Sequence, residues 1–312
     1  MICKICESSN VRRLARLQPA RGGKCSVLQC KRCGFVWAHP LPDMNVEFLN
    51  RIYGKEYVDE LRALERDECG YQVLYGAAMH QMDKVESMLN GAVGHALNIG
   101  AMTLANRVLV DRGWDLTVVE VSRYAAQSAR ESWGLDVLEA KIEEIVLFQD
   151  YFRFVKLSHI IEHLADPMFV LNKLWKVLKP GGVLLVETDN AGGLKTWVET
   201  TVRRLLGEDL TARMVYKLTG KDLRKRYGRL LPYEHICLFR RQTLIQALKM
   251  AGFDVLEVLC PAQGDPVWFP FTNQSENWSP LEKVMVKVDK LGALLGVGEV
   301  LVAFGRKPNS SG

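Results

Sequence analysis

Between residues 95 and 187, short apolar runs alternate with segments that carry helix signals, and this alternation constrains the fold more than any other feature of the chain. The apolar runs cover residues 95–99, 116–120, 154–157 and 183–187. Ser122 can cap the start of one intervening helix, and Gly134 can end it. Strands that are apolar along their length and are joined through helices form parallel sheets covered on both faces. The sequence therefore predicts an α/β fold with a doubly wound, Rossmann-like sheet.

The first two predicted strands carry the pattern of an adenosine-binding site. Gly100 follows the first strand, and Glu120 ends the second strand twenty residues later. A glycine in the turn lets a ligand approach the backbone, and an acid at the next strand end binds ribose hydroxyls. The spacing fits a dinucleotide or S-adenosylmethionine (SAM). A plain tight turn beside a surface glutamate is the alternative interpretation.

Four cysteines stand in two pairs, Cys3 with Cys6 and Cys30 with Cys33. Two residues between paired thiols let both sulfurs turn inward, and two such pairs complete the tetrahedral four-sulfur site that suits Zn²⁺. A segment of this size buries too little apolar surface to fold without the metal. We expect a structural zinc ribbon over residues 1–42. A redox-active pair is the alternative, which the presence of two matched pairs disfavours.

Charge is unevenly distributed along the chain. The formal net charge is +5, but residues 1–40 hold eight Lys/Arg against Glu7 alone, and residues 203–229 hold nine against three acids. The remainder is net acidic, which argues against a uniformly basic nucleic-acid binder. The second basic stretch could meet a diphosphate or an anionic membrane surface, or simply be a solvated face. No apolar run approaches the ~18 residues of a membrane span. We expect a cytoplasmic protein.

Two blocks of sequence resemble class I SAM-dependent methyltransferases. The first joins residues 159–167 to residues 178–190, and the second joins residues 233–236 to residues 251–255. The cysteine pairs ahead of them are similar to those of bacterial methyltransferases that act on sugars and other small metabolites. The resemblance implies a methyltransferase domain over residues 91–308, preceded by a helical connector or lid over residues 43–90.

The resemblance also implies which residues bind the cofactor. They are Asn98, Gly100, Ala101, Glu120, Val121, Lys141, Ile142, His159 and His163. The family's first loop usually reads acid-x-Gly-x-Gly-x-Gly, whereas residues 98–104 keep one glycine and begin with an amide. This departure motivates a second hypothesis, in which the fold is a catalytically inactive scaffold or binding protein.

His235 is the candidate general base. Histidine titrates near neutral pH, and Glu234 beside it can orient the imidazole. In similar sugar methyltransferases a Glu-His pair at this position serves catalysis. The alternative role for His235 is to position the helix that follows. The expected acceptor is a small metabolite or a sugar, for example one linked to a nucleotide. RNA, docked by the basic ribbon, is a third and less favoured hypothesis.

Two insertions interrupt the predicted methyltransferase domain, at residues 191–232 and 261–298. The first is where substrate-specific segments fall in the resembling family. The second contains tryptophans and phenylalanines that could cover the acceptor or form a dimer contact. The sequence leaves that choice, and the oligomeric state, open.

Overall fold

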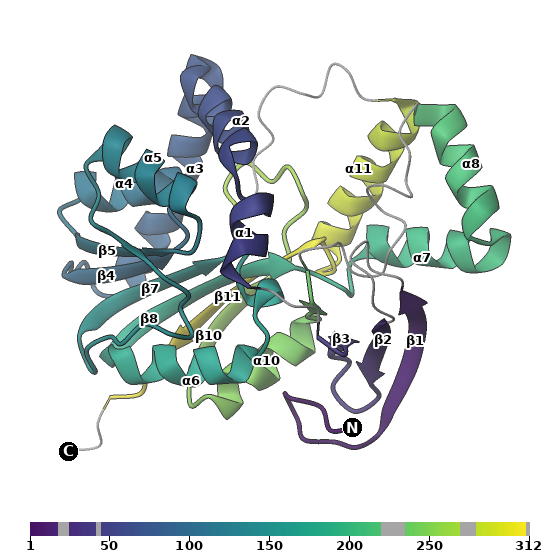
Figure 1. The fold of residues 1–312 in the computed structure, drawn as a ribbon, viewed down its shortest axis with the longest axis horizontal. Coiled ribbons are helices and arrows are strands. Elements are labelled where there is room, and N and C mark those ends of the chain that lie inside the picture. Colours follow the sequence, from purple (N-terminus) through teal and green to yellow (C-terminus); the bar gives the residue numbers. More distant parts are fainter. Residues whose placement is uncertain (18–24, 42–44, 220–234, 269–278, 310–312) are drawn as a thin grey trace.

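The computed structural model describes residues 1–17, 25–41, 45–219, 235–268 and 279–309. Within them a seven-stranded sheet is ordered β10-β11-β8-β7-β4-β5-β6 (Figure 1). Its strands are β4 (His95–Ile99), β5 (Asp115–Glu120), β6 (Val137–Glu139), β7 (Phe152–Ser158), β8 (Leu178–Asp189), β10 (Asp254–Leu259) and β11 (Val300–Arg306). Strands β4 to β8 pair in parallel, and β11 runs antiparallel to both of its neighbours. The predicted Rossmann-like α/β fold is confirmed.

Alternate residues of the central strands face opposite sides of the sheet, which explains the continuous apolar runs. Phe154 and Leu185 pack in a core with α3 (Glu68–Met88) and α4 (Leu104–Asp111). Val155 and Leu184, which are paired with each other across β7 and β8, belong to a core on the other face. That core includes α6 (Pro167–Val177) and α10 (Arg241–Met250). Strands buried on both faces need apolar residues at every position. Helix α5 (Arg123–Trp133) joins α3 and α4 on their side of the sheet (Figure 1).

The N-terminal cysteine segment forms a second, four-stranded sheet that includes a piece of the methyltransferase-like region. Its strands are β1 (Val11–Leu17), β2 (Cys25–Cys30), β3 (Val36–His39) and β9 (Cys237–Leu238), in that order. Strand β9 pairs antiparallel with β3 through Trp37 and Cys237. The ribbon is therefore joined to the larger domain by backbone hydrogen bonds.

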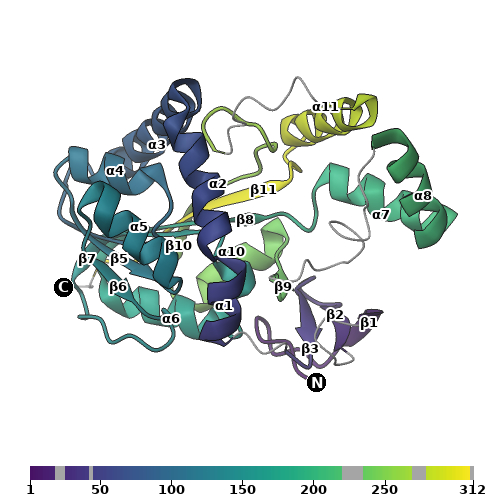
Figure 2. The ribbon, with the colours of Figure 1, turned by 45° about the horizontal axis from the view of Figure 1, so that its top comes forward.

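Helices fill the remaining described segments. Helices α1 (Val46–Ile52) and α2 (Lys55–Arg66) precede α3, and all three lie within the predicted connector at residues 43–90. The two insertions contribute α7 (Leu194–Leu206), α8 (Glu208–Thr219) and α11 (Pro280–Leu294). These three contact one another and project together beyond the end of the sheet, at the right of Figures 1 and 2. Among the described residues, no helix is both long and apolar enough to cross a bilayer.

A buried ion pair joins β7 to β8 and is hydrogen-bonded to α3. Its loss is expected to destabilise the protein. Lys156 Nζ lies 2.5 Å from Glu187 Oε2 and donates to Gln81 Oε1 at 2.9 Å. Both charged side chains are almost completely buried. Lys156→Met leaves the Glu187 carboxylate unpaired in the core, so we expect a loss of about 3–5 kcal/mol in the free energy of unfolding. Urea denaturation measures this. The double variant Lys156→Met/Glu187→Leu should recover most of the loss, and equal stability of the single variant and the wild type would contradict the interpretation.

Candidate active site

The turn after β4 is fixed by a network of buried amides. Gly100 has a φ of +109°, which L side chains rarely adopt. Asn98 Nδ2 donates to Gly100 O at 3.1 Å and to Asn106 Oδ1 at 2.6 Å, and Asn106 Nδ2 donates to Ala101 O at 2.8 Å. Asn98 is fully buried. The side-chain amide of Asn98, which stands where similar methyltransferases usually have an acid, therefore stabilises the turn.

Glu120 ends β5 beside this turn and is linked to it directly. The backbone N–H of Ala101 donates to Glu120 Oε2 at 2.8 Å, and that of Ser122 donates to Oε1 at 2.8 Å. Burial raises the pKa of Glu120, and these backbone hydrogen bonds counteract the increase. Each carboxylate oxygen can accept a further hydrogen bond. The structure thus brings together Gly100, Ala101 and Glu120, as an adenosine site requires.

Val121, Lys141 and Ile142 lie at the next strand ends along the same edge. Val121 directly follows Glu120, and the N–H of Ala140 donates to Glu120 O at 3.0 Å, which places residues 140–142 alongside. The Ile142 side chain is buried in the core, and its carbonyl accepts from Lys173 Nζ at 2.7 Å. Lys141 is partly buried and lies 3.9 Å from Glu144. Within residues 140–142, the Lys141 side chain and the backbone therefore remain available to face a ligand.

A cluster of histidines surrounds one buried carboxylate at the end of β7. His159 has a φ of +51°, an uncommon conformation outside glycine that often marks functional sites. Its Nδ1 lies 3.2 Å from Oε1 of Glu162, which is completely buried. The His163 and His235 rings meet edge to face with centroids 4.8 Å apart. The potential ligand atoms of Glu162, His163 and His235 all lie within 4.8 Å of one another.

Burial and charge set the protonation of this cluster. Burial would raise the pKa of Glu162, but its hydrogen bond to His159 and the three nearby histidines lower the pKa to about 2. Burial would lower the pKa of His159, but Glu162 raises it to about 9. The pair is therefore a carboxylate and an imidazolium at neutral pH.

The connector helices close one side of this cluster with tyrosines. Tyr53 OH lies 3.4 Å from His163 Nε2, and Tyr53 packs edge to face against Tyr57. Ser122 Oγ donates to Tyr53 O at 2.6 Å, so the connector also contacts the end of β5. Neither tyrosine was singled out within the predicted connector at residues 43–90. Helical spacing carried no signal that would distinguish these two from packing residues.

Asp189 at the end of β8 is a second residue that the sequence did not single out. Its Oδ2 lies 3.5 Å from His235 Nδ1. Glu234, the expected partner of His235, lies outside the described residues.

The four cysteines of the ribbon converge as the spacing predicts. Cys3 Sγ lies 3.6 Å from Cys33 Sγ, Cys6 Sγ lies 3.5 Å from Cys30 Sγ, and all four sulfurs are within 4.8 Å of one another. A tetrahedral zinc with bonds of about 2.3 Å places its sulfurs about 3.8 Å apart. The donor set and its spacing fit Zn²⁺.

The ribbon is docked against the segment that carries His235. Ala38 N donates to Ile236 O at 2.9 Å, and Ile236 N donates to Glu162 O at 2.9 Å. Thr243 Oγ1 donates to Cys33 O at 2.5 Å, so a carbonyl of the second cysteine pair contacts α10. Phe35 packs against Phe239 with centroids 5.2 Å apart. The position of His235 therefore depends on the folded ribbon.

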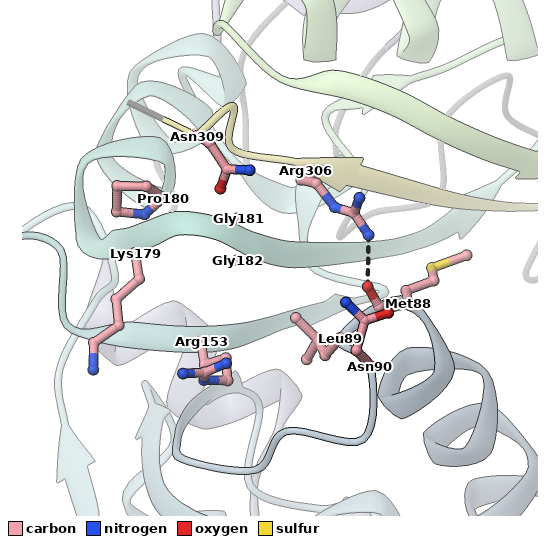
Figure 3. Close-up of a pocket in the computed structure, with 10 residues that line it drawn as sticks. All are labelled: Met88, Leu89, Asn90, Arg153, Lys179, Pro180, Gly181, Gly182, Arg306 and Asn309. Atoms are coloured by element: carbon pink, nitrogen blue, oxygen red, sulfur yellow. Dashed lines mark hydrogen bonds between the residues drawn. The ribbon is translucent and has the colours of Figure 1, made fainter. Parts of the chain in front are cut away.

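A cavity of about 290 Å³ lies at the opposite edge of the sheet, away from these residues. Figure 3 shows Arg153, Lys179 and Arg306 around it, together with the backbone of Gly181 and Gly182. Arg153 and Lys179 are the second residues of β7 and β8, at the amino ends of these strands, whereas ligands of parallel sheets bind at the carboxyl ends. We therefore place the active site at the histidine cluster and not at this cavity.

Comparison with known proteins identifies a matching domain family and neighbours in fold. A model of the methyltransferase domain family matches residues 99–258, just over half of the chain. A SAM-dependent methyltransferase of Thermotoga maritima, described as a possible histamine N-methyltransferase, superposes with a TM-score of 0.50 at 19% identity, covering 82% of this chain and 99% of its own. The cyclase SpnF superposes with a TM-score of 0.52 at 17% identity, covering 86% of this chain and 99% of its own. A search of curated proteins gave no significant match.

Proposed function

This chain belongs to the methyltransferase domain family, and from that premise we propose that it transfers a methyl group from SAM to a small metabolite or sugar. The observation that carries the proposal is the Gly100–Ala101–Glu120 network, which lies beside the histidine cluster at the carboxyl ends of the strands. Ile160, next to His159, lies within 4 Å of the position that a Cβ on Gly100 would occupy. A cofactor bound at the Gly100–Ala101–Glu120 network would present its methyl group near the histidine cluster.

In this proposal each end of the site has one task. Gly100, Ala101, Val121 and Lys141 line the adenosine part of the cofactor, and Glu120 binds the ribose hydroxyls. The cluster of Glu162, His163 and His235 removes the proton of the acceptor, which methyl transfer to a hydroxyl or amine requires. His235 stays the predicted residue for this step. Tyr53 and Tyr57 help to exclude water from the reacting end. The four ribbon cysteines would bind one structural Zn²⁺.

The proposed class of acceptor rests on the surface of the first insertion. Of the basic stretch at residues 203–229, the described part lies on α7 and α8, which expose Trp197 and Leu205. Mixed basic and apolar surface suits an acceptor with a diphosphate and an apolar part, or an anionic surface. Screening sugar nucleotides with radiolabelled SAM tests the function. Transfer to one class of acceptor is expected, and transfer to RNA instead would support the third hypothesis.

Glu120→Ala is expected to weaken SAM binding by about 10- to 100-fold. Hydrogen bonds to a charged group contribute about 1.5–3 kcal/mol, and the variant also leaves the Ala101 N–H without its acceptor. Calorimetric titration measures the affinity. Glu139→Ala is the matched control, because Glu139 pairs with Glu120 in register on β6 but is exposed. Equal SAM affinity in both variants would show that Glu120 is not a cofactor ligand.

A non-catalytic binding protein is the second candidate function. The observation that favours it is the turn itself, where the Ala101 N–H is already used by Glu120 and a single glycine remains. A folded protein that holds zinc but does not bind SAM would support this candidate.

A further inference from the structure

Two buried atoms of the histidine cluster lack hydrogen-bond partners. Glu162 Oε1 is held by His159, but Glu162 Oε2 has no partner among the described residues. The same is true of His235 Nδ1, which lies 3.5 Å from Asp189 Oδ2. Leaving a buried polar atom unpaired costs about 1–3 kcal/mol, and more for a charged group. Two such atoms in one cluster indicate that something else binds there.

The chemistry of the two atoms identifies what would satisfy them. A carboxylate oxygen only accepts hydrogen bonds, and an imidazole nitrogen without its proton also only accepts. When His235 Nδ1 carries no proton, the two atoms cannot satisfy each other, and a cation satisfies both at once. The ion pair of His159 with Glu162 occupies one carboxylate oxygen and leaves the second directed elsewhere.

We propose that Glu162, His163 and His235 bind a divalent first-row transition metal ion. Two histidines and one carboxylate form the donor set of open metal sites that keep positions free for substrate. Adjacent ligands with bonds of about 2.1 Å lie about 3 Å apart, and opposite ones about 4 Å. The ligand atoms now lie up to 4.8 Å apart, so binding one ion requires them to move closer together. His163 and His235 can do this because both are only partly buried, whereas Glu162 is completely buried.

The surrounding residues support the proposed ligands. His159 fixes the Glu162 carboxylate through its other oxygen, as partners behind metal ligands commonly do. Ile236 N donates to Glu162 O at 2.9 Å, so the two chain segments that supply the ligands are joined next to the site. The proposed site and the cysteine site of the ribbon offer different donor atoms. Nitrogen and oxygen donors accept Mn²⁺ or Co²⁺, whereas four thiolates select Zn²⁺.

The role of this ion in methyl transfer rests on the proposed function, and it specifies the class of acceptor. A divalent ion lowers the pKa of a hydroxyl that coordinates it. An acceptor with two adjacent oxygens, such as the vicinal diol of a sugar, can fill two open positions. Since His235 is then a ligand, the ion takes over the activation assigned to His235 as a free base, and one hydroxyl loses its proton to solvent. That oxygen then attacks the methyl group of SAM. The new carbon–oxygen bond forms as the carbon–sulfur bond breaks, and sulfur keeps the electron pair as a neutral thioether.

Mn²⁺ titration followed by electron paramagnetic resonance tests the site directly. The protein is first brought to one zinc per chain, verified by elemental analysis, so that the ribbon is filled. We expect one bound Mn²⁺ per chain, with affinity reduced at least tenfold in Glu162→Gln and in His235→Ala. His80→Ala is the matched control, because His80 is an exposed histidine remote from the cluster, and it should bind Mn²⁺ as the wild type does.

The outcomes separate this inference from the proposed function. Absence of a Mn²⁺ site, or equal affinity in wild type and in the folded His235→Ala variant, overturns the metal site. If Glu162→Gln fails to fold by circular dichroism, His235→Ala and His163→Ala decide the question. Mn²⁺ binding without methyl transfer would leave the metal site standing and refute the function. Methyl transfer that is unchanged without Mn²⁺, in a chain that holds one zinc, would retain the function and refute the metal's role.

Discussion

Cys30→Ser is expected to abolish zinc binding and to unfold the ribbon. The ribbon core depends on the four-cysteine cluster, and apparent binding free energies of structural zinc are about 10–16 kcal/mol, most of which is folding free energy. Elemental analysis after dialysis should find no zinc, and limited proteolysis should remove the first forty residues rapidly. Cys69→Ser is the control, since Cys69 is an exposed cysteine on α3 outside the cluster. Full zinc retention in Cys30→Ser would contradict the four-cysteine site.

The same variant should also lose methyl transfer, although Cys30 contacts no reacting group. Strand β9 begins two residues after His235 and is held by β3 of the ribbon. Unfolding of β3 removes that partner and the hydrogen bond from Ala38 to Ile236. SAM binding should persist, because the Gly100–Glu120 network is held by hydrogen bonds within residues 98–122. A variant with lost zinc and normal turnover would show that the ribbon does not position His235.

His235→Ala is expected to reduce turnover by about 10²- to 10⁴-fold while SAM affinity stays unchanged. Removing an acid–base group commonly has an effect of this size, and loss of a ligand to the proposed ion would act on the same step. Single-turnover methyl transfer and calorimetric titration measure the two quantities. His80→Ala is again the control, and undiminished turnover in His235→Ala would contradict its assignment to acceptor activation.

The sheet and the four-cysteine cluster were predictable because both depend on local patterns. Strands buried on two faces are apolar at each position, as Phe154 and Val155 illustrate, and paired cysteines define their own knuckles. The turn after β4 was predictable in place but not in detail. The sequence could not reveal that Asn98 and Asn106 brace it, because that contact depends on side-chain directions within a folded core.

The histidine cluster depends on contacts between distant parts of the chain, which is why it was only partly predicted. His163 and His235 are 72 positions apart in the sequence, and Tyr53 is 110 residues from His163. The short β9 was also unforeseeable, since two residues carry no periodicity and the strand exists only because β3 lies beside it. Glu162 was overlooked because a glutamate in a helical turn gives no indication that it will be completely buried.

Calorimetric titration of the zinc-loaded wild-type protein with SAM and S-adenosylhomocysteine tests the proposed cofactor site most directly. The network of Gly100, Ala101 and Glu120 predicts one site per chain with micromolar affinity for both compounds. Absence of binding to a folded protein with full zinc content would contradict a SAM-dependent function, and the fold would then serve to bind a partner.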